Sequence, residues 1–411
     1  MKILYITSSF PCGPGESFLI PELAELSNRG HKVYIAPIHP RGKVFHESIL
    51  ELNLPLLLKP LLHLIYVVFF IYEFFCHPNR MIRSISILFQ SRNKSILVKN
   101  FSVLLKASWL SWFCRKHKIE HIHAHWVSYS STAALIASIL SGIEWSFTAH
   151  RWDIVDNNLL ELKIKKAKFC RFISSSGVRL ASERVHEMPL DKMVVLHMGV
   201  KLPEFECREP IVNENPKVIV CPANLIEVKG HRYLIKAVKQ LRDKNCRIDL
   251  WLIGDGPLKQ ELMDYCNQLH LTQSIRFVGQ KPHHELMNLY KNGHVFGVVL
   301  PSVDLGNGEH EGIPVSLIEA MSFDIPVIST DTGGIPELLQ NGAGIIVPHQ
   351  NPTALAHAIE TLVTDFGLRN EMIVKARFVL KSQFDIQIIV DQLVGHMNPE
   401  GQVNLKEMVN S

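Results

Sequence analysis

Short apolar runs alternate with longer amphipathic segments from residue 2 onward, a pattern typical of parallel α/β layers. Six runs in the first half are predicted to be strands: Lys2–Thr7, Lys32–Pro37, His121–His125, Trp145–Thr148, Phe169–Ser174 and Met193–Leu196. The second half repeats the pattern with six more: Val218–Cys221, Ile248–Ile253, Ser274–Val278, Val295–Leu300, Pro326–Ser329 and Gly344–Val347. We therefore predict an α/β protein with two parallel sheets and helices between the strands.

A segment without periodicity separates the two halves. Residues 201–217 are rich in Pro, Glu and Asn and are predicted to be a linker. We accordingly expect a Rossmann-like domain over residues 1–200, a second over 218–380, and a C-terminal helical segment over 381–411 able to pack back on the first domain. Ligands of open α/β sheets bind outside the carboxyl ends of the strands. The two domains are expected to face each other across a cleft that holds the site.

Residues 60–80 are strongly apolar but are interrupted by His63 and Glu73. The run falls short of the roughly 20 residues that span a bilayer. A helical projection gathers its polar residues on one face, opposite a wide apolar face: His63, Tyr66, Glu73, His77 and Arg80. Basic residues follow the run, so an amphipathic helix lying in the plane of a membrane surface is one interpretation. A helix buried in the N-terminal domain is the other.

The charge is distributed unevenly. Residues 1–205 carry 25 Lys and Arg against 15 Asp and Glu, and the remainder carries 18 against 24. A basic first half indicates either an anionic partner, such as a membrane or a phosphorylated lipid, or merely a solvated surface. The eight cysteines are scattered without a CxxC pair, which predicts reduced thiols in a cytoplasmic protein. Lys2–Thr7 is too short for a secretory signal.

Two carboxylates, Glu311 and Glu319, lie eight positions apart across a predicted loop-to-helix junction. Gly312 can let a ligand approach the backbone, and Pro314 suits the first position of a helix. The amides of the next three residues would then point out of the helix start, where the helix dipole favours a phosphate: Val315, Ser316 and Leu317. The alternative is that both glutamates are ordinary helix-start and surface residues.

Two further segments follow predicted strands. Lys229 belongs to the turn Ala223–Gly230, where a lysine can neutralise phosphate charge. Leu252–Pro257 ends a strand in a tight glycine turn. Each of these signals is weak when taken alone, because a lysine at such a turn is usually only exposed.

Together these segments resemble glycosyltransferase family 4, the retaining transferases with the GT-B fold. The resemblance covers nearly the whole chain and is densest over Cys221–Gly230, Leu252–Pro257 and Pro301–Leu338, which includes EGIPVSLIEAMSFDIPVISTDTGGIPELL. In the first half, the segments around Ser8–Leu19, His121–His125 and Ser146–His150 are similar to the family's colanic-acid and other exopolysaccharide transferases.

The resemblance implies a sugar transfer from a UDP- or GDP-linked donor to a saccharide acceptor, with retention of the anomeric configuration. The family uses neither cofactor nor metal, and the absence of any Asp-x-Asp argues against the metal-dependent glycosyltransferase architecture. The apolar helix and the basic half point to a lipid-linked acceptor in exopolysaccharide or lipopolysaccharide biosynthesis. We therefore expect a cytoplasmic protein held peripherally at the inner face of the membrane.

The resemblance also implies roles for individual residues. Glu311 would bind donor-sugar hydroxyls near the reacting carbon, Glu319 the nucleotide ribose, and Lys229 the leaving diphosphate. His150 would project from the N-terminal domain toward the donor sugar. Phosphate, sugar and base would be supported by the remaining candidate residues: Gly312, Ile313, Pro314, Val315, Ser316, Leu317, Gly279 and Gly15.

One position departs from the family pattern. Family members usually carry an arginine where this chain has Asn224, and that arginine pairs with the lysine on the diphosphate. An amide donates hydrogen bonds but brings no charge, which puts stabilisation of the leaving group in doubt. Arg232 or Arg151 is a candidate substitute.

Other readings stay open. A catalytically silent sugar-nucleotide-binding partner of a polysaccharide assembly is the alternative that Asn224 motivates. His121, His123 and His125 share one face of a strand, but their spacing is awkward for tetrahedral zinc, and a strand end is the preferred interpretation. A nicotinamide oxidoreductase is disfavoured, because its fingerprint is G-x-G-x-x-G. The nearest match begins at Gly13 and Gly15 but has Phe18 in place of the third glycine. Nucleic-acid binding rests on charge alone, so we expect none.

Overall fold

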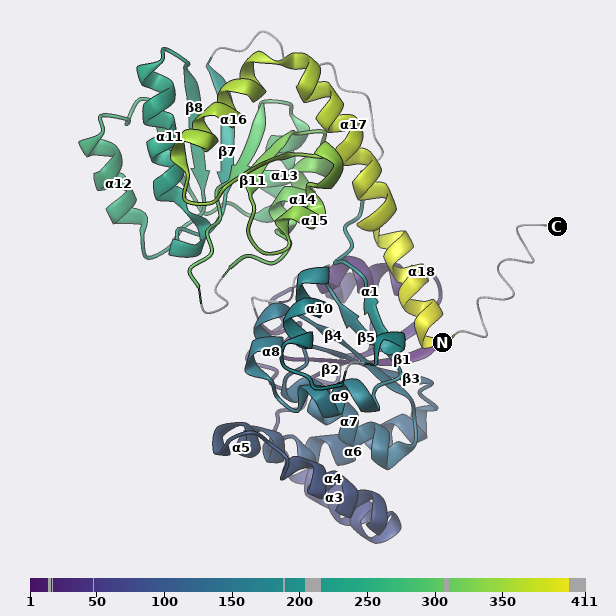
Figure 1. Cartoon of the computed structure of the whole chain (residues 1–411). Coiled ribbons are helices and arrows are strands. Elements are labelled where there is room, and N and C mark those ends of the chain that lie inside the picture. Colours follow the sequence, from purple (N-terminus) through teal and green to yellow (C-terminus); the bar gives the residue numbers. More distant parts are fainter. Residues whose placement is uncertain are drawn as a thin grey trace, which may run out of the picture. The chain divides into compact units, whose positions relative to one another are not determined.

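The computed structural model describes residues 1–13, 16, 18–46, 48–187, 189–203, 216–306 and 310–398. The chain divides into two compact units (Figure 1). The N-terminal unit comprises Met1–Gly199 and the C-terminal helix α18 (Ile386–Met397), and the C-terminal unit comprises Val200–Asp385. Most of the predicted linker, residues 204–215, lies outside the described residues.

The N-terminal unit contains a parallel sheet of six strands in the order β2-β1-β3-β4-β5-β6. Its strands are β1 (Lys2–Thr7), β2 (Lys32–Pro37), β3 (His121–His125), β4 (Trp145–Ala149), β5 (Cys170–Phe172) and β6 (Met193–Val195). Alternate residues of β1 enter different cores, because successive side chains of a strand point to opposite faces. Leu4 and Ile6 join the core on one face, and Ile3 and Tyr5 join the other.

The C-terminal unit contains a second parallel sheet of six strands, in the order β12-β11-β10-β7-β8-β9. Its strands are β7 (Lys217–Pro222), β8 (Ile248–Ile253), β9 (Ile275–Gly279), β10 (Gly297–Leu300), β11 (Val327–Thr330) and β12 (Ile345–Val347). All twelve strands predicted from the sequence are present, and the two parallel sheets with intervening helices confirm the predicted α/β class.

Helices cover both sheets. Those of the N-terminal unit are α1 (Leu19–Asn28), α2 (Ser48–Glu51), α3 (Leu64–Cys76), α4 (Pro78–Leu88), α5 (Lys94–Ser102), α6 (Leu104–His117), α7 (Tyr129–Ser141), α8 (Arg151–Asp156), α9 (Leu160–Lys166) and α10 (Ser175–Ser182). Those of the C-terminal unit are α11 (His231–Asp243), α12 (Lys259–Gln268), α13 (His283–Lys291), α14 (Val315–Ser322), α15 (Ile335–Leu338), α16 (Pro352–Thr364) and α17 (Phe366–Gln383). In the part of the chain that the structure describes, no helix combines the length and apolarity needed to cross a bilayer.

Helix α18 packs against α1 within the N-terminal unit. Its buried apolar side, which includes Ile389 and Leu393, shares a core with Leu23 of α1. Arg29 at the end of α1 donates hydrogen bonds to the carboxylate of Asp391 and, at 2.8 Å, to a backbone carbonyl of α18. Apolar burial and this pairing together fix the C-terminal helix on the first unit.

A buried ion pair ties α1 to the sheet. Glu22 and Arg171 are both fully buried, and an Arg171 nitrogen lies 2.5 Å from the Glu22 carboxylate. The Tyr5 hydroxyl donates to the same carboxylate at 2.6 Å, and Arg171 also donates to the carbonyls of Leu196 and His197. Burial opposes ionisation of Glu22, but Arg171 and the hydrogen bonds outweigh it and lower the pKa of this carboxyl. The satisfied network lets two charges lie in an apolar core.

We predict that Glu22→Ala destabilises the N-terminal unit by about 3–5 kcal/mol, because the buried Arg171 loses its counter-charge. Glu25→Ala on the same helix removes a partly exposed pair with Arg29 and should cost less than about 1 kcal/mol. Urea denaturation followed by tryptophan fluorescence measures this, since five of the six tryptophans lie in this unit. Equal midpoints for the two variants would contradict the assigned role of the pair.

Candidate functional site

The strand order of the C-terminal sheet reverses at β7, which pairs with β10 on one side and β8 on the other. Because the strands are parallel, the loops after β7 and β10 leave the same edge and lie side by side, the place where open α/β sheets bind ligands. Val303 donates a backbone hydrogen bond to Val228 (2.9 Å) across these loops. A Cβ on Gly230, whose φ is +65°, would lie 2.0 Å from the Pro301 oxygen, so the close approach requires glycine.

This approach brings two predicted site residues together. Lys229 Nζ lies 2.6 Å from the Glu311 carboxylate, and each side chain is 17% exposed. The Glu311 backbone is held from behind, since its carbonyl accepts a hydrogen bond from the His310 ring at 2.7 Å. A Cβ on Gly333 would lie 1.8 Å from that carbonyl oxygen. The site therefore presents a cation and a carboxylate that neutralise each other while both still reach solvent.

Helix α14 begins one position later than expected. Pro314 is the N-cap with an extended backbone, and Val315 is the first helical residue, so the prediction that Pro314 opens the helix is wrong by one position. The reason is that the Pro314 carbonyl already accepts the first helical hydrogen bonds, from Leu317 at 3.1 Å and Ile318 at 3.4 Å. The Leu317 side chain is buried in the core, and its amide already donates to the Pro314 carbonyl. Of the three amides predicted to meet a phosphate, that of Leu317 is therefore engaged within the protein.

The remaining residues of this segment are half-buried: Gly312, Ile313, Val315 and Ser316. A Cβ on Gly312 would meet no atom within 4 Å. The protein's own packing therefore does not demand glycine there, and the open space lies directly beside Glu311.

Glu319 has a partner that sequence reasoning missed. Its carboxylate lies 2.7 Å from His283 Nε2, at the start of α13. The hydrogen bond to Glu319 is the main cause of a raised pKa at His283. Since Gly279 ends β9 four residues before His283, the pair joins α14 to the segment that follows Gly279. The one available signal was a histidine soon after a strand end.

Asn224 and Gly279 both adjoin Gly254, in the turn after β8. The Gly254 amide donates to the Gly279 carbonyl at 3.0 Å, and a Cβ on Gly254 would lie 2.1 Å from the Ala223 oxygen. Asn224 is exposed beside this contact. The candidate substitute cation Arg232 pairs with Glu261 at 2.6 Å, and both side chains are about half exposed.

In the N-terminal sheet the order reverses at β1, which pairs with β2 and β3. The loop after β1 carries Glu16, which sequence reasoning missed. Its buried carboxylate accepts hydrogen bonds from the amides of Ser8, Ser9 and Phe10 and, at 2.6 Å, from the indole of Trp126 after β3. A lone acid in a Gly- and Ser-rich loop was the signal available. The predicted contact residue Gly15 lies outside the described residues.

His150 lies at the carboxyl end of β4 in an aromatic cage. It is 7% exposed, and its Nε2 lies 2.7 Å from His125 Nε2. Its ring centroid lies 4.2 Å from that of Trp126 and 5.2 Å from that of Phe18. Burial, with a smaller effect of Arg171, lowers the pKa of His150 to about 3. The imidazole is therefore neutral at physiological pH and can act only through its hydrogen bonds and its ring.

The histidines of β3 form a buried row bonded to β4. His121 and His123 contact the Ser146 hydroxyl at 2.7 and 2.8 Å, and His123 also contacts Thr148 at 2.9 Å. His121 and His123 are thus interior residues of the sheet, and His125 reaches its carboxyl end. Within the described ranges, no group of three His, Cys, Asp or Glu is arranged to hold a metal.

The three histidines of this row, together with His150, predict that the protein is destabilised by acid. Burial lowers the pKa of His123 and His150 to about 3, and those of His121 and His125 well below the ordinary value. In the unfolded chain all four take up protons near pH 6.5, so protons favour unfolding and stability falls as the pH drops from about 6.5 toward 3. Asp153 opposes this, because burial raises its pKa to about 8 and the folded form keeps a proton there.

We expect a net uptake of about three protons by these five groups on unfolding near pH 5. Calorimetry in buffers of different ionisation enthalpy measures the uptake. His123→Gln keeps a hydrogen-bonding side chain without titration and should lower it by about one proton. A melting temperature that does not change between pH 7 and pH 4.5 would rule this account out.

With the geometry established, three comparisons identify the protein's relatives. Residues 204–378 match the family model described as glycosyl transferases group 1. The putative colanic acid biosynthesis glycosyltransferase WcaL of Escherichia coli is 34% identical over 207 residues, which is 50% of each chain. The amylovoran biosynthesis glycosyltransferase AmsK of Erwinia amylovora is 30% identical over 252 residues, 59% of this chain and 61% of AmsK. The chain thus spans about half the length of the curated relatives it matches.

The fold has a solved counterpart. The crystal structure of Anabaena Alr3699/HepE in complex with UDP-glucose superposes with a TM-score of 0.67 at 18% identity, covering 97% of this chain and all of that one. This likeness confirms the predicted GT-B fold class. Residues 204–378 are therefore similar to the glycosyl transferases group 1 family, on a chain with the GT-B fold.

Proposed function

We propose that the protein is a retaining glycosyltransferase of family 4 that moves a sugar from a nucleotide-diphosphate donor to a saccharide acceptor without a metal ion. The observation that carries this proposal is the Lys229–Glu311 pair at 2.6 Å, set at the switch point of the C-terminal sheet beside the start of α14. A paired cation and carboxylate beside helix-start amides suit a ligand that carries both phosphates and hydroxyls.

In this proposal the donor replaces one partner of each ion pair. Lys229 exchanges the Glu311 carboxylate for the diphosphate and balances its charge as it leaves. The released Glu311 accepts hydrogen bonds from donor-sugar hydroxyls. The amides of Val315 and Ser316 take phosphate oxygens, and that of Leu317 can join them only by giving up its bond to the Pro314 carbonyl. Glu319 takes the ribose hydroxyls. The role assigned to His150 is to bind the donor sugar as a neutral imidazole, and the acceptor attacks from the side of the departing diphosphate.

The printed names of the relatives support a role in building surface polysaccharide. WcaL and AmsK are named for colanic acid and amylovoran biosynthesis, and the HepE structure holds UDP-glucose. We extend this to a UDP- or GDP-linked donor and a lipid-linked saccharide acceptor, used at the cytoplasmic face of a membrane. The basic N-terminal half is the feature of this chain that favours an anionic membrane surface.

A second candidate is a silent sugar-nucleotide binder. Asn224 favours it, because the side chain brings no charge to the diphosphate and Arg232 is engaged by Glu261. Lys229, Glu311 and Glu319 favour the enzyme, because all three side chains are partly exposed and a donor can reach them.

The first experiment is a thermal-shift screen against UDP, GDP, ADP and their glucose and mannose conjugates, with and without EDTA. Ligand bound to the native state raises the melting temperature by mass action. We expect a shift that is selective for one nucleotide and insensitive to EDTA. Loss of the shift in EDTA would refute metal independence, and no shift with any nucleotide would refute the donor class.

The second experiment separates the two glutamates, using the donor that gives the shift and following nucleotide release. Glu311→Gln should lower turnover by about 100-fold or more with nucleotide affinity unchanged, since it acts on the sugar. Glu319→Ala should weaken nucleotide binding about 10–100-fold through the lost charged hydrogen bonds. Glu285→Ala on α13 is a matched control with an exposed carboxylate. Parental behaviour of both site variants would overturn the assignment, and binding without any turnover in the parent would favour the silent binder.

A further inference from the structure

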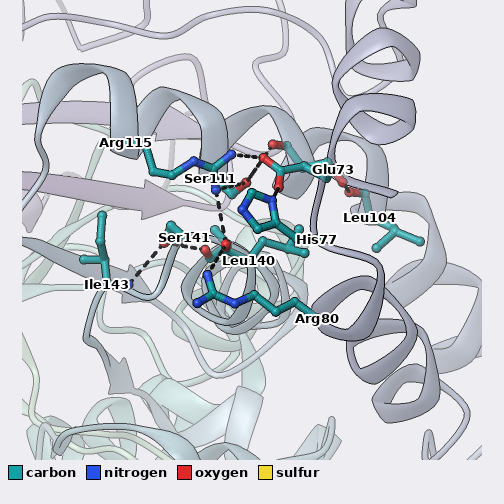
Figure 2. Close-up of polar contacts among 11 residues, drawn as sticks. Glu73, His77, Arg80, Leu104, Ser111, Arg115, Leu140, Ser141 and Ile143 are labelled. Atoms are coloured by element: carbon teal, nitrogen blue, oxygen red, sulfur yellow. Dashed lines mark hydrogen bonds and ion pairs between the residues drawn. The ribbon is translucent and has the colours of Figure 1, made fainter. Parts of the chain in front are cut away.

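Helix α3 is attached to the protein by its polar side. Glu73 is completely buried, although it lies on the face that helical projection reserves for polar residues. Its carboxylate accepts a hydrogen bond from the Ser111 hydroxyl at 2.7 Å, pairs with Arg115 of α6, and lies 2.9 Å from His77 (Figure 2). The expected single helix is also broken at His77, where α3 ends and α4 begins.

Aromatic packing and backbone hydrogen bonds complete this attachment. Phe69 packs against Trp112 in a tilted arrangement with ring centroids 4.5 Å apart, and Tyr66 packs likewise against Trp109 at 5.3 Å. Arg80 at the start of α4 donates to the Leu140 carbonyl at the end of α7 (Figure 2), at 2.9 Å. Helices α3 and α4 therefore form an outer layer on the side of α6 away from the sheet (Figure 1). Turning α3 about its axis would strip the buried carboxylate of its partners, so its orientation is fixed.

The fixed orientation leaves the apolar side of α3 in solvent. We define the α3 stripe as its exposed apolar residues: Leu64, Val67, Val68, Ile71, Tyr72, Phe74 and Phe75. Leu64 is 87% exposed and Phe75 77% exposed. The stripe follows the spacing of one helical face, and proteins rarely expose so contiguous an apolar surface unless it binds something.

The exposed charges of the segment that carries the stripe are of one sign. Between Glu51 and Glu120 the sequence contains ten Lys and Arg and a single acid, Glu73. Because Glu73 is buried and paired, every exposed charged side chain of this segment is a cation, and Arg83, Arg92 and Lys94 are among them. An exposed apolar helix face in a segment whose exposed charges are all positive complements a surface that is apolar within and anionic at its edge.

We propose that the α3 stripe inserts into the interface of an anionic lipid bilayer, with the surrounding lysines and arginines on the lipid head groups. A second copy of the chain is a less favourable partner for the stripe than a bilayer, because a symmetric contact would bring two sets of cations together. The proposal rests on the membrane location within the proposed function and names the surface that achieves it. It does not require that the assigned sugar-transfer chemistry be correct.

The test is flotation of the full chain with vesicles of phosphatidylglycerol and phosphatidylcholine, compared with phosphatidylcholine alone. The parent should float with the anionic vesicles, and raising the salt to 0.5 M should weaken its binding, because salt screens the lipid charge. Ile71→Ser with Phe75→Ser should lower the partition coefficient by about tenfold or more. The matched control is Val374→Ser with Phe378→Ser on α17, which removes an exposed apolar pair of the same spacing and should bind as the parent does.

Three results would overturn the proposal: parental vesicle binding by the α3 double variant, equal loss in the α17 control, or failure of the parent to bind anionic vesicles. A parent that does not bind but dimerises through the stripe, shown by light scattering of the parent and the α3 variant, would identify a second copy as the occupant. Nucleotide-induced thermal shifts of the α3 variant should equal those of the parent. Failure of the nucleotide screen together with intact vesicle binding would count against the sugar-transfer chemistry alone.

Discussion

Parallel strand pairing on both sides of β1 and β7 is the constraint on which the rest of the structure depends. The strand order of each sheet reverses at one of these two strands. The loops that follow the two neighbouring strands there leave the same edge of the sheet and lie against each other. In the C-terminal unit this places Lys229 against Glu311, and in the N-terminal unit it places Glu16 against Trp126. Gly230 is needed because the two loops approach so closely that a Cβ has no room.

Three buried carboxylates hold helices and a loop of the N-terminal unit in place. Glu22 binds Arg171 across α1 and β5, Glu73 binds Arg115 across α3 and α6, and Glu16 gathers the amides of the loop after β1. A buried charge is tolerated only when its hydrogen bonds are satisfied, so each of these carboxylates permits one arrangement of the elements that it joins. At Glu73 this specificity has an outward consequence, since fixing the polar side of α3 commits its apolar side to the surface.

The charged residues of the candidate site follow a different logic. Lys229 and Glu311 are each partly exposed, as is Glu319 beside His283. Pairs of this kind gain little stability in water and can exchange partners readily. The fully buried pair of Glu22 and Arg171 holds the fold, whereas the partly exposed pairs are the ones that the proposed function assigns to a ligand. His150 is intermediate, because it is buried and neutral but sits at the end of its strand against other rings.

The sequence by itself determined the twelve strands, the α/β class and the turn residues around Lys229, because these depend on short-range periodicity and on backbone conformations that only glycine adopts readily. It also placed Glu311 and Glu319 on either side of a helix start, with an error of one position at Pro314. Only the tertiary structure decided the partners. His283 lies 36 residues from Glu319, and Arg115 lies 42 residues from Glu73, so no local pattern links them. The orientation of α3 was likewise undecided, since helical projection identifies two faces but not which one the rest of the chain will bury.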